Sequence, residues 1–407
     1  MRILWFTNTQ SLFQAESTGY NGGGWISSLE ENIANNTDIE LGVCFFSDVK
    51  TFKVIKNKTT YYPVCVYDTK FKRVRHRFLY RNHDPIEVDA FMKVIEDFKP
   101  EIIHIFGSEK SFGLISYHTK IPIVIHIQGI LIPYLNSYFP PGTNKFDFIR
   151  YYGLFKSISY LESYLNFKYN AKREQLIISN CRNFTGRTEW DKNVVSLYSN
   201  KPNYFYCSEI LRKSFYTAPV WNNKSTAQLE ILTTISQNTY KGFDLILKTA
   251  KILKMFSSIE FSWKVYGIKS YVFWEKKLNI NSKSVNVHQM GVVNEGSLIN
   301  AMQNASMFVH PSYIDNSPNS VCEAQLVGMP VVATNVGGVS ALIENNVNGI
   351  LVPANDPFTL ASKIMELFYN KEMAQSLGKN ARETALQRHA IQTIIDDTLN
   401  VYKAILN

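Results

Sequence analysis

Two carboxylates in the C-terminal part of the sequence have a spacing that suits the binding of hydroxyl groups. Asp315 follows a strand-like apolar run at 306–312, and Glu323 lies eight residues further on. Glu323 would fall within about the first turn of a helix starting near Asn319, where unpaired backbone N–H groups can hold a diphosphate. Its carboxylate could accept hydrogen bonds from the vicinal hydroxyls of a ribose, and Asp315 could hold a second polyol. The alternative is that both are only helix-dipole and capping residues, and the spacing alone favours this alternative.

A glycine-rich segment, GGGW at 22–25, stands between the first apolar run and the first helical stretch. Glycines let the backbone approach a phosphate closely, so Gly23 and Gly24 are candidate phosphate-binding residues. The dinucleotide fingerprint G-x-G-x-x-G is absent from the sequence. A simple tight turn is therefore the alternative interpretation of this segment.

The sequence favours neither a metal site nor a disulfide framework. It contains no D-x-D, H-x-x-x-H or H-E-x-x-H spacing, and its five cysteines form no C-x-x-C pair. The longest apolar stretch, at 121–133, is interrupted by His126 and Gln128, so no membrane-spanning helix is expected. We therefore expect a cytoplasmic protein that needs no metal, or one bound to the inner face of the cytoplasmic membrane.

The elements that must position these residues alternate between strand-like and helix-like runs, which predicts two α/β units with parallel sheets. Ligands bind such sheets beyond the carboxyl ends of the strands, and a cleft between the units is the expected site. The expected division is 1–217, a polar linker at 218–228, 229–385, and a final amphipathic helix at 386–407. The expected strands are 2–8, 39–47, 101–107, 121–129 and 176–180, followed by 229–236, 261–267, 285–291, 306–312 and 329–335.

The positive charge is concentrated in one segment. The net charge is +9, and residues 50–81 alone hold ten Lys or Arg and one acid, Asp68. Such a patch could meet an anionic membrane or a nucleic acid, but no recognisable nucleic-acid module accompanies it. Residues 134–169 mix Tyr and Phe with lysines, as an interfacial amphipathic segment would. A solvated basic face and an ordinary aromatic core are the alternatives.

The stretch from His310 to Pro353 resembles the C-terminal signature of the retaining glycosyltransferase family 4. That signature is an acid, seven residues, a Glu, then A-x4-G-x-P-V-V-A-T and two glycines. The matching residues are Asp315, Glu323, Ala324, Gly328, Pro330, Val331, Val332, Ala333, Thr334, Gly337 and Gly338. The resemblance implies the GT-B fold: two Rossmann-like domains facing each other across a cleft, with the C-terminal helix crossing back to the first domain.

The resemblance also implies an activity. The implied enzyme is a retaining, hexosyltransferase-type glycosyltransferase. It would move a sugar from a UDP- or GDP-sugar to an acceptor hydroxyl and would need no metal ion. Likeness to bacterial surface-polysaccharide enzymes implies a glycan or lipid-linked glycan acceptor. A non-catalytic nucleotide-sugar-binding homologue and a basic nucleic-acid-binding protein are the alternative functions.

Site residues follow from the same resemblance. Glu323 would bind the ribose, Asp315 a hydroxyl of the donor sugar, and Lys241, followed by Gly242, the leaving diphosphate. The sequence departs from the family pattern in having Asp315 for a Glu, Pro318 for a glycine, Ser236 for an Arg and Gln128 for a His. The remaining donor-site candidates are Gly23, Gly24, Gly291, Ser317, Asn319 and Ser320, with Gln128 and Ser236 at their altered positions.

The segment 183–216 resembles that of some surface-polysaccharide enzymes and carries four charged candidates. Arg187, Asp191, Glu209 and Arg212 could contact the acceptor or lie at the hinge. A structural ion-pair network is the alternative interpretation.

Overall fold

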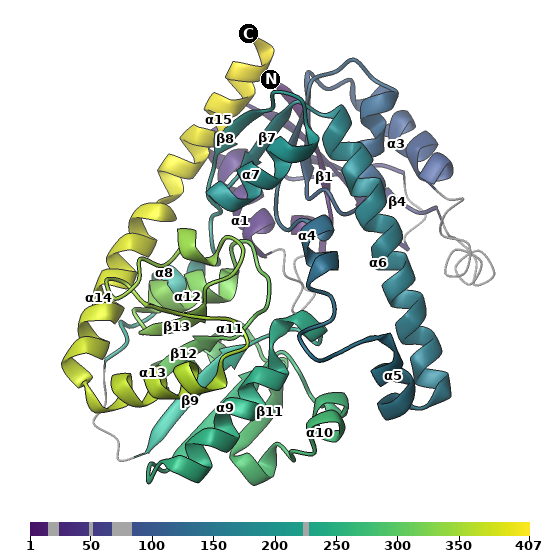
Figure 1. Cartoon of the computed structure of the whole chain (residues 1–407). Coiled ribbons are helices and arrows are strands. Elements are labelled where there is room, and N and C mark those ends of the chain that lie inside the picture. Colours follow the sequence, from purple (N-terminus) through teal and green to yellow (C-terminus); the bar gives the residue numbers. More distant parts are fainter. Residues whose placement is uncertain (15–23, 49–51, 67–83, 223–227) are drawn as a thin grey trace. The chain divides into compact units, whose positions relative to one another are not determined.

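The computed structural model describes residues 1–14, 24–48, 52–66, 84–222 and 228–407, which form two compact units (Figure 1). Unit 1 comprises Met1–Ile132, Leu165–Ile210 and His389–Asn407, and unit 2 comprises Pro133–Tyr164 and Leu211–Arg388. The main difference from the expected division is that 133–164 belongs with the second unit. Of the expected basic segment 50–81, residues 50–51 and 67–81 lie outside the described residues, as does Gly23.

Unit 1 is built on a sheet that has eight strands within the described ranges, in the order β3-β4-β2-β1-β5-β6-β7-β8. Every neighbouring pair is parallel except β3 and β4, which form an antiparallel edge. The strands are β1 (Arg2–Thr7), β2 (Glu40–Phe46), β3 (Val54–Lys56), β4 (Thr59–Val64), β5 (Ile102–Phe106), β6 (Ile123–His126), β7 (Asn183–Gly186) and β8 (Asn203–Tyr206). The helices are α1 (Gly24–Asn36), α3 (Asp84–Phe98), the later part of α6 (Leu154–Asn180), α7 (Glu189–Tyr198) and α15 (Ile391–Leu406), with short 3-10 turns η1 (Ser11–Gln14) and η3 (Ser111–Tyr117).

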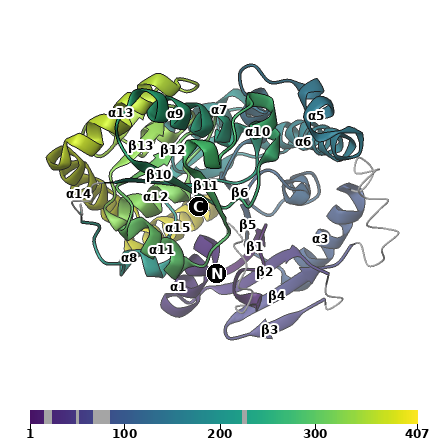
Figure 2. The same cartoon turned by 90° about the horizontal axis from the view of Figure 1, so that it is seen from below.

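Strand β1 is apolar without interruption because helices cover both faces of its sheet. Ile3 and Trp5 pack in the same core as α1, whereas Leu4 and Phe6 pack in the core that contains α3. Figure 2 shows α1 and α3 on opposite sides of β1 and β2. The faces of the unit 1 sheet are thereby shielded from water. A ligand could reach this sheet only at the ends of its strands.

The C-terminal helix α15 belongs to unit 1, as the fold class predicts. Ile394, Ile395 and Val401 join the apolar cluster that includes Trp5 and Trp25. The buried hydroxyl of Tyr402 accepts a hydrogen bond from Trp5 Nε1 at 3.0 Å and lies 2.7 Å from His104 Nδ1. The helix is therefore fixed by polar contacts as well as by its apolar face.

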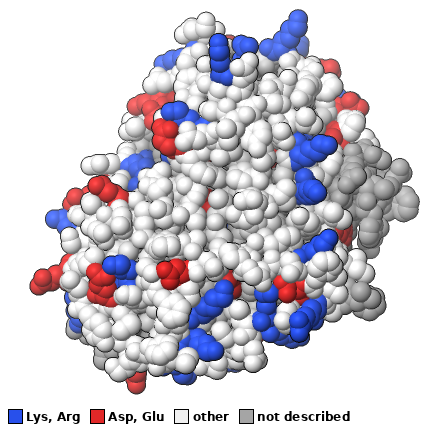
Figure 3. All heavy atoms as spheres, in the orientation of Figure 1, with Lys and Arg blue, Asp and Glu red and all other residues white. Residues whose placement is uncertain are grey.

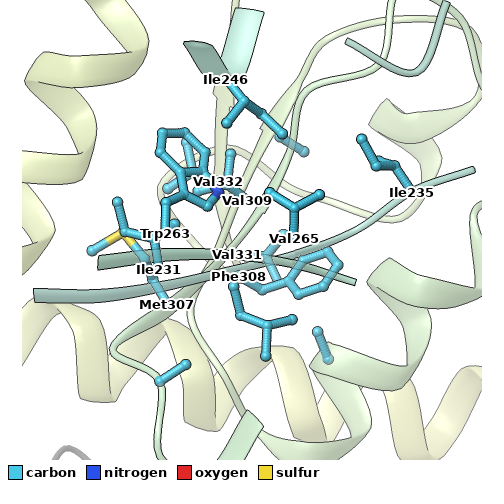
Figure 4. Packing of buried hydrophobic residues seen from close by; sticks show 14 of the residues in the cluster. Ile231, Ile235, Ile246, Trp263, Val265, Met307, Phe308, Val309, Val331 and Val332 are labelled. Atoms are coloured by element: carbon cyan, nitrogen blue, oxygen red, sulfur yellow. The ribbon is translucent and has the colours of Figure 1, made fainter. Parts of the chain in front are cut away.

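Unit 2 has a parallel sheet, six-stranded among the described residues, in the order β11-β10-β9-β12-β13-β14. Figure 4 shows its core, where Trp263, Ile231 and Val309 from neighbouring strands pack together. The strands are β9 (Leu229–Thr234), β10 (Phe261–Tyr266), β11 (Val287–Gly291), β12 (Met307–His310), β13 (Val331–Thr334) and β14 (Ile350–Val352). The helices are α4 (Leu131–Asn136, entering from unit 1), α5 (Lys145–Tyr152), α8 (Lys213–Tyr216), α9 (Phe243–Phe256), α10 (Val272–Leu278), α11 (Glu295–Gln303), α12 (Asn319–Val327), α13 (Pro357–Tyr369) and α14 (Lys371–Arg388). Three short 3-10 turns are η4 (Thr239–Lys241), η5 (Lys283–Val285) and η6 (Val339–Ala341).

One expected strand is wrong. Residues 176–180 form the last turns of α6 and not a strand. Ile177 and Ile178 are buried while Leu176 is half exposed, which is the pattern of a helix with one face on a core. A short apolar run has no periodicity that separates a buried strand from a buried helix segment.

Candidate functional site

Asp315 lies just after β12, in unit 2, and polar groups surround its buried carboxylate. Lys241 Nζ is 2.6 Å from Oδ2, and His310 Nε2 is 3.1 Å from the same oxygen. The hydroxyl of Tyr134 donates to Oδ1 at 3.3 Å and accepts from the amide of Asn316 at 3.0 Å. The structure thus brings together Asp315 and Lys241, which the sequence placed 74 residues apart.

This environment keeps Asp315 charged. Burial alone would raise the pKa of its carboxyl, but the positive charge of Lys241 and the contact with His310 outweigh it and hold the pKa well below its ordinary value. Asp315 is therefore an ionised acceptor at neutral pH, suited to hydrogen bonds from hydroxyl groups.

Two glycines allow close approach of the backbone on either side of Asp315. Gly242 has φ +78°, and a Cβ there would lie 2.0 Å from the carbonyl oxygen of Pro311. Gly337 has φ +53°, and a Cβ there would lie 2.0 Å from the carbonyl oxygen of Asp315. The amide of Gly338 donates to that same oxygen at 2.9 Å. The glycines of the sequence motif are thus required by the close backbone approach.

Helix α12 begins at Asn319, as predicted, with Pro318 as its N-cap residue. Ser317 is buried immediately before the helix, and Asn319 and Ser320 open it. The first N–H groups of such a helix carry partial positive charge. The expected contacts of these three residues with a sugar and a diphosphate stay predictions.

Glu323 lies in α12, and its buried carboxylate pairs with an arginine. Arg212 Nε is 2.8 Å from Oε1 of Glu323, and Arg212 Nη1 is 3.5 Å from Oε1 of Glu295 in α11. Burial raises the pKa of Glu323, the hydrogen bond and charge of Arg212 oppose the rise, and Glu295 adds to it. Arg212 and Glu323 are 111 residues apart, so no local sequence pattern signals this pair.

The other donor-site candidates are spread over both units. Ser236 follows β9 and is exposed, and its hydroxyl accepts a hydrogen bond from Asn238 at 3.1 Å. Gly291 ends β11 with φ +74°. In unit 1, Gly24 opens α1, and the carbonyl of Gln128 after β6 accepts from Arg187 Nη2 at 3.3 Å.

Three of the four charged candidates from 183–216 form a buried network in unit 1. Arg187 Nη1 is 2.7 Å from Oε2 of Glu209, and His126 Nε2 is 3.8 Å from its Oε1. Asp191 accepts from the amide of Arg187 at 3.2 Å and from the hydroxyl of Tyr204. These contacts match the structural ion-pair network that was the alternative interpretation of the segment 183–216. The fourth candidate, Arg212, belongs to unit 2. An acceptor role for these residues stays a prediction.

Across the described ranges, no group of three or more His, Cys, Asp or Glu is placed to hold a metal ion. Likewise, none of the described helices combines the length and apolar character needed to cross a bilayer.

Comparisons with known proteins relate this geometry to a family. Residues 222–384 match the family model "Glycosyl transferases group 1". An uncharacterised glycosyltransferase of Methanocaldococcus jannaschii is 27% identical over 143 residues, covering 35% of this chain and 39% of that protein. The capsular polysaccharide biosynthesis glycosyltransferase CapM of Staphylococcus aureus is 28% identical over 108 residues, covering 26% of this chain and 28% of that protein.

A third relative is an N,N'-diacetylbacillosaminyl-diphospho-undecaprenol alpha-1,3-N-acetylgalactosaminyltransferase of Campylobacter jejuni, 32% identical over 101 residues, covering 25% of this chain and 26% of that protein. The matches thus span about a quarter to two fifths of the length of these curated relatives.

Solved structures resemble the chain over nearly its whole length. A sucrose-phosphate synthase from Thermosynechococcus elongatus has a TM-score of 0.75 at 14% identity, covering 99% of this chain and 98% of that one. HepE of Anabaena, solved in complex with UDP and glucose, has a TM-score of 0.66 at 14% identity, covering 99% of this chain and 100% of that one. These likenesses confirm the predicted fold class.

Proposed function

We propose that the chain, which has a GT-B fold and whose residues 222–384 match the family model of the group 1 glycosyl transferases, transfers a sugar from a nucleotide sugar to an acceptor hydroxyl. The donor is a UDP- or GDP-sugar, and the anomeric configuration is retained. The observation that carries the proposal is the buried contact of Lys241 with Asp315 at the carboxyl end of the unit 2 sheet, where parallel sheets bind ligands.

In the proposed reaction, the bond between the anomeric carbon and the diphosphate oxygen breaks as the acceptor oxygen bonds to that carbon, and the leaving diphosphate takes up the proton of the acceptor hydroxyl. Negative charge then builds on the leaving diphosphate. Lys241 and the N-terminal amides of α12 are preorganised to stabilise that charge, and no metal is assigned a role. Asp315 accepts a hydrogen bond from the donor sugar, and Glu323 accepts hydrogen bonds from the ribose.

The proposed acceptor is a glycan or lipid-linked glycan of the bacterial cell surface. Support comes from the similarity to a capsular polysaccharide biosynthesis glycosyltransferase and to a glycosyltransferase named for an undecaprenol-linked substrate. We further propose docking on anionic lipid at the inner membrane face. Helix α5 exposes Phe146 and Ile149 beside Lys145 and Arg150, and Figure 3 shows Lys and Arg side chains gathered near α5 and α10.

The test of the proposed function is release of free UDP or GDP from a panel of nucleotide sugars. Glu323→Gln is expected to weaken donor binding, because charge-assisted hydrogen bonds contribute about 1.5–3 kcal/mol. Lys241→Ala is expected to lower turnover about 100-fold or more, because it removes a preorganised cation. The control is Lys363→Ala, which removes an exposed Lys363–Glu366 pair on α13.

Wild-type turnover in both site variants would contradict the donor-site assignment. Tight nucleotide-sugar binding without release of nucleotide would favour the second candidate function, a non-catalytic binding homologue. Ser236 and Gln128, which stand where family members have Arg and His, are the residues that favour this alternative.

A further inference from the structure

Contacts within α8 fix the position of Arg212, whose side chain extends from there to Glu323. Arg212 is the N-cap residue of α8, and its guanidinium lies 4.6 Å from the centre of the Phe215 ring. The amide of the preceding Leu211 donates to the hydroxyl of Tyr216 at 3.1 Å. These contacts restrict the rotamers of the arginine, so its hydrogen bond to Glu323 costs little further side-chain entropy.

The two oxygens of Glu323 differ. Oε1 accepts from Arg212 Nε at 2.8 Å, whereas Oε2 has no hydrogen-bond partner within the described part of the chain. The side chain of Glu323 is only 8% exposed and that of Arg212 18% exposed, so the pair is largely shielded from water. A buried carboxylate with one oxygen held by an arginine and the other unused can accept hydrogen bonds from a ligand.

We propose that Arg212 is the positioning residue for nucleotide recognition: it holds Oε1 of Glu323, so that Oε2 can accept hydrogen bonds from the ribose hydroxyls. This inference rests on the proposed function, in which Glu323 binds the ribose. It assigns Arg212 to the donor site of unit 2 instead of to an acceptor or hinge contact.

The charged groups around Glu323 allow the role of Arg212 to be measured through the pH dependence of nucleotide affinity. Arg212 stands between two carboxylates, Glu323 and Glu295, and Ser214 donates to the far oxygen of Glu295 at 2.5 Å. Without the guanidinium, burial and the charge of Glu295 both disfavour an ionised Glu323. The pKa of Glu323 would then rise further, and nucleotide affinity would fall more steeply towards low pH than it does in the wild type.

A purely structural ion pair between α8 and α12 predicts something else. Removing it would lower the stability of the fold, since breaking a buried pair leaves an uncompensated charge. It would leave the pH dependence of ligand affinity unchanged. The pH profile therefore separates a positioning role from a structural one.

The experiment is titration calorimetry of UDP and GDP at pH 5.5 to 8.5 on the full chain. The variants are Arg212→Met, Arg212→Lys, Glu323→Gln, the double variant Arg212→Met/Glu323→Gln, and the control Lys213→Met, an exposed neighbour. The terminal phosphate of UDP or GDP itself titrates within this range, so each variant is compared with the wild type at the same pH, and the control is expected to parallel the wild type. Arg212→Met is expected to bind about tenfold more weakly or worse at low pH and to recover as pH rises.

Arg212→Lys is expected to restore most of the affinity. The double variant is expected to lose the additional pH dependence seen in Arg212→Met, because the carboxyl of Glu323 is gone. Thermal unfolding of each variant shows that it is folded, and Arg212→Lys provides a charge-conserving test if Arg212→Met does not fold. Profiles for Arg212→Met that parallel the wild type, or an Arg212→Lys variant no better than Arg212→Met, would overturn the inference. Failure of the wild-type chain to bind either nucleotide would instead contradict the proposed function, and the inference with it.

Discussion

At the scale of single residues, Asp315 and Glu174 are buried carboxyls held in opposite protonation states. The cation of Lys241 keeps Asp315 ionised, whereas burial raises the pKa of Glu174 to about 8. Glu174, in α6, accepts from Ser108 Oγ at 2.6 Å and from the amide of Ile132 at 3.0 Å, and no cation contacts it among the described residues. The first carboxyl suits ligand binding and the second is expected to be protonated at neutral pH.

The raised pKa of Glu174 gives a signed pH dependence of stability. Between its ordinary value and about 8, the folded chain binds a proton that the unfolded chain does not. The free energy of unfolding should therefore fall as pH rises through this window, by up to about 1.4 kcal/mol per pH unit. Urea unfolding at pH 5.5 and 7.5 measures the slope, and Glu174→Gln is expected to reduce it. An unchanged slope in that variant would show that other groups cause it.

At the scale of secondary-structure elements, the attachment of α15 to unit 1 can be tested through one hydroxyl. Tyr402→Phe leaves the buried Trp5 Nε1 and His104 Nδ1 without their shared partner. We expect the free energy of unfolding to fall by about 1–3 kcal/mol, the cost of unsatisfied buried polar groups. The control is Tyr369→Phe on α13, where the tyrosine is 63% exposed and no change is expected. Equal urea midpoints for Tyr402→Phe and wild type would contradict this assignment.

Comparison of the predicted and observed elements shows which of them can be predicted from the sequence alone. Continuous apolar runs predicted strands such as β1 and β12, and the motif placed Asp315, Glu323 and Lys241 correctly relative to α12 and the strand ends. Strands β7 and β8 were missed because NFTG and NYFY are short and partly polar. The contacts Arg212–Glu323 and Tyr134–Asp315 join residues 111 and 181 positions apart, and only the tertiary fold creates them.

At the scale of the whole molecule, the proposed membrane docking predicts reversible binding to vesicles that contain phosphatidylglycerol. Phe146, 65% exposed, and Ile149, 41% exposed, lie on α5 with the cations Lys145 and Arg150. Phe146→Ser/Ile149→Ser should reduce sedimentation with anionic vesicles, and added salt should weaken it further, because the apolar and charged contributions add. The matched control is Met255→Ser/Phe256→Ser, two exposed apolar residues of α9.

Equal sedimentation of the two double variants, or none for the wild type at low salt, would contradict docking through α5. The five basic residues also expected to contribute, Lys70, Lys72, Arg73, Arg75 and Arg77, lie outside the described residues, and their neutralisation is a separate arm of the same assay.

The divided composition of unit 1 has a consequence for the order in which a newly translated chain can fold. The ribosome releases residues 1–210 first, but the helix that completes the cluster around Trp5 and Trp25 is made last, after 211–388. At about 5–20 residues per second, that intervening stretch takes on the order of 10 to 40 s to synthesise. Unit 2 can complete its sheet within this time, whereas the cluster around Trp5 and Trp25 still lacks the apolar side chains of α15. A nascent chain of this protein is therefore most exposed to chaperones and proteases through its first-made half, until its last helix emerges.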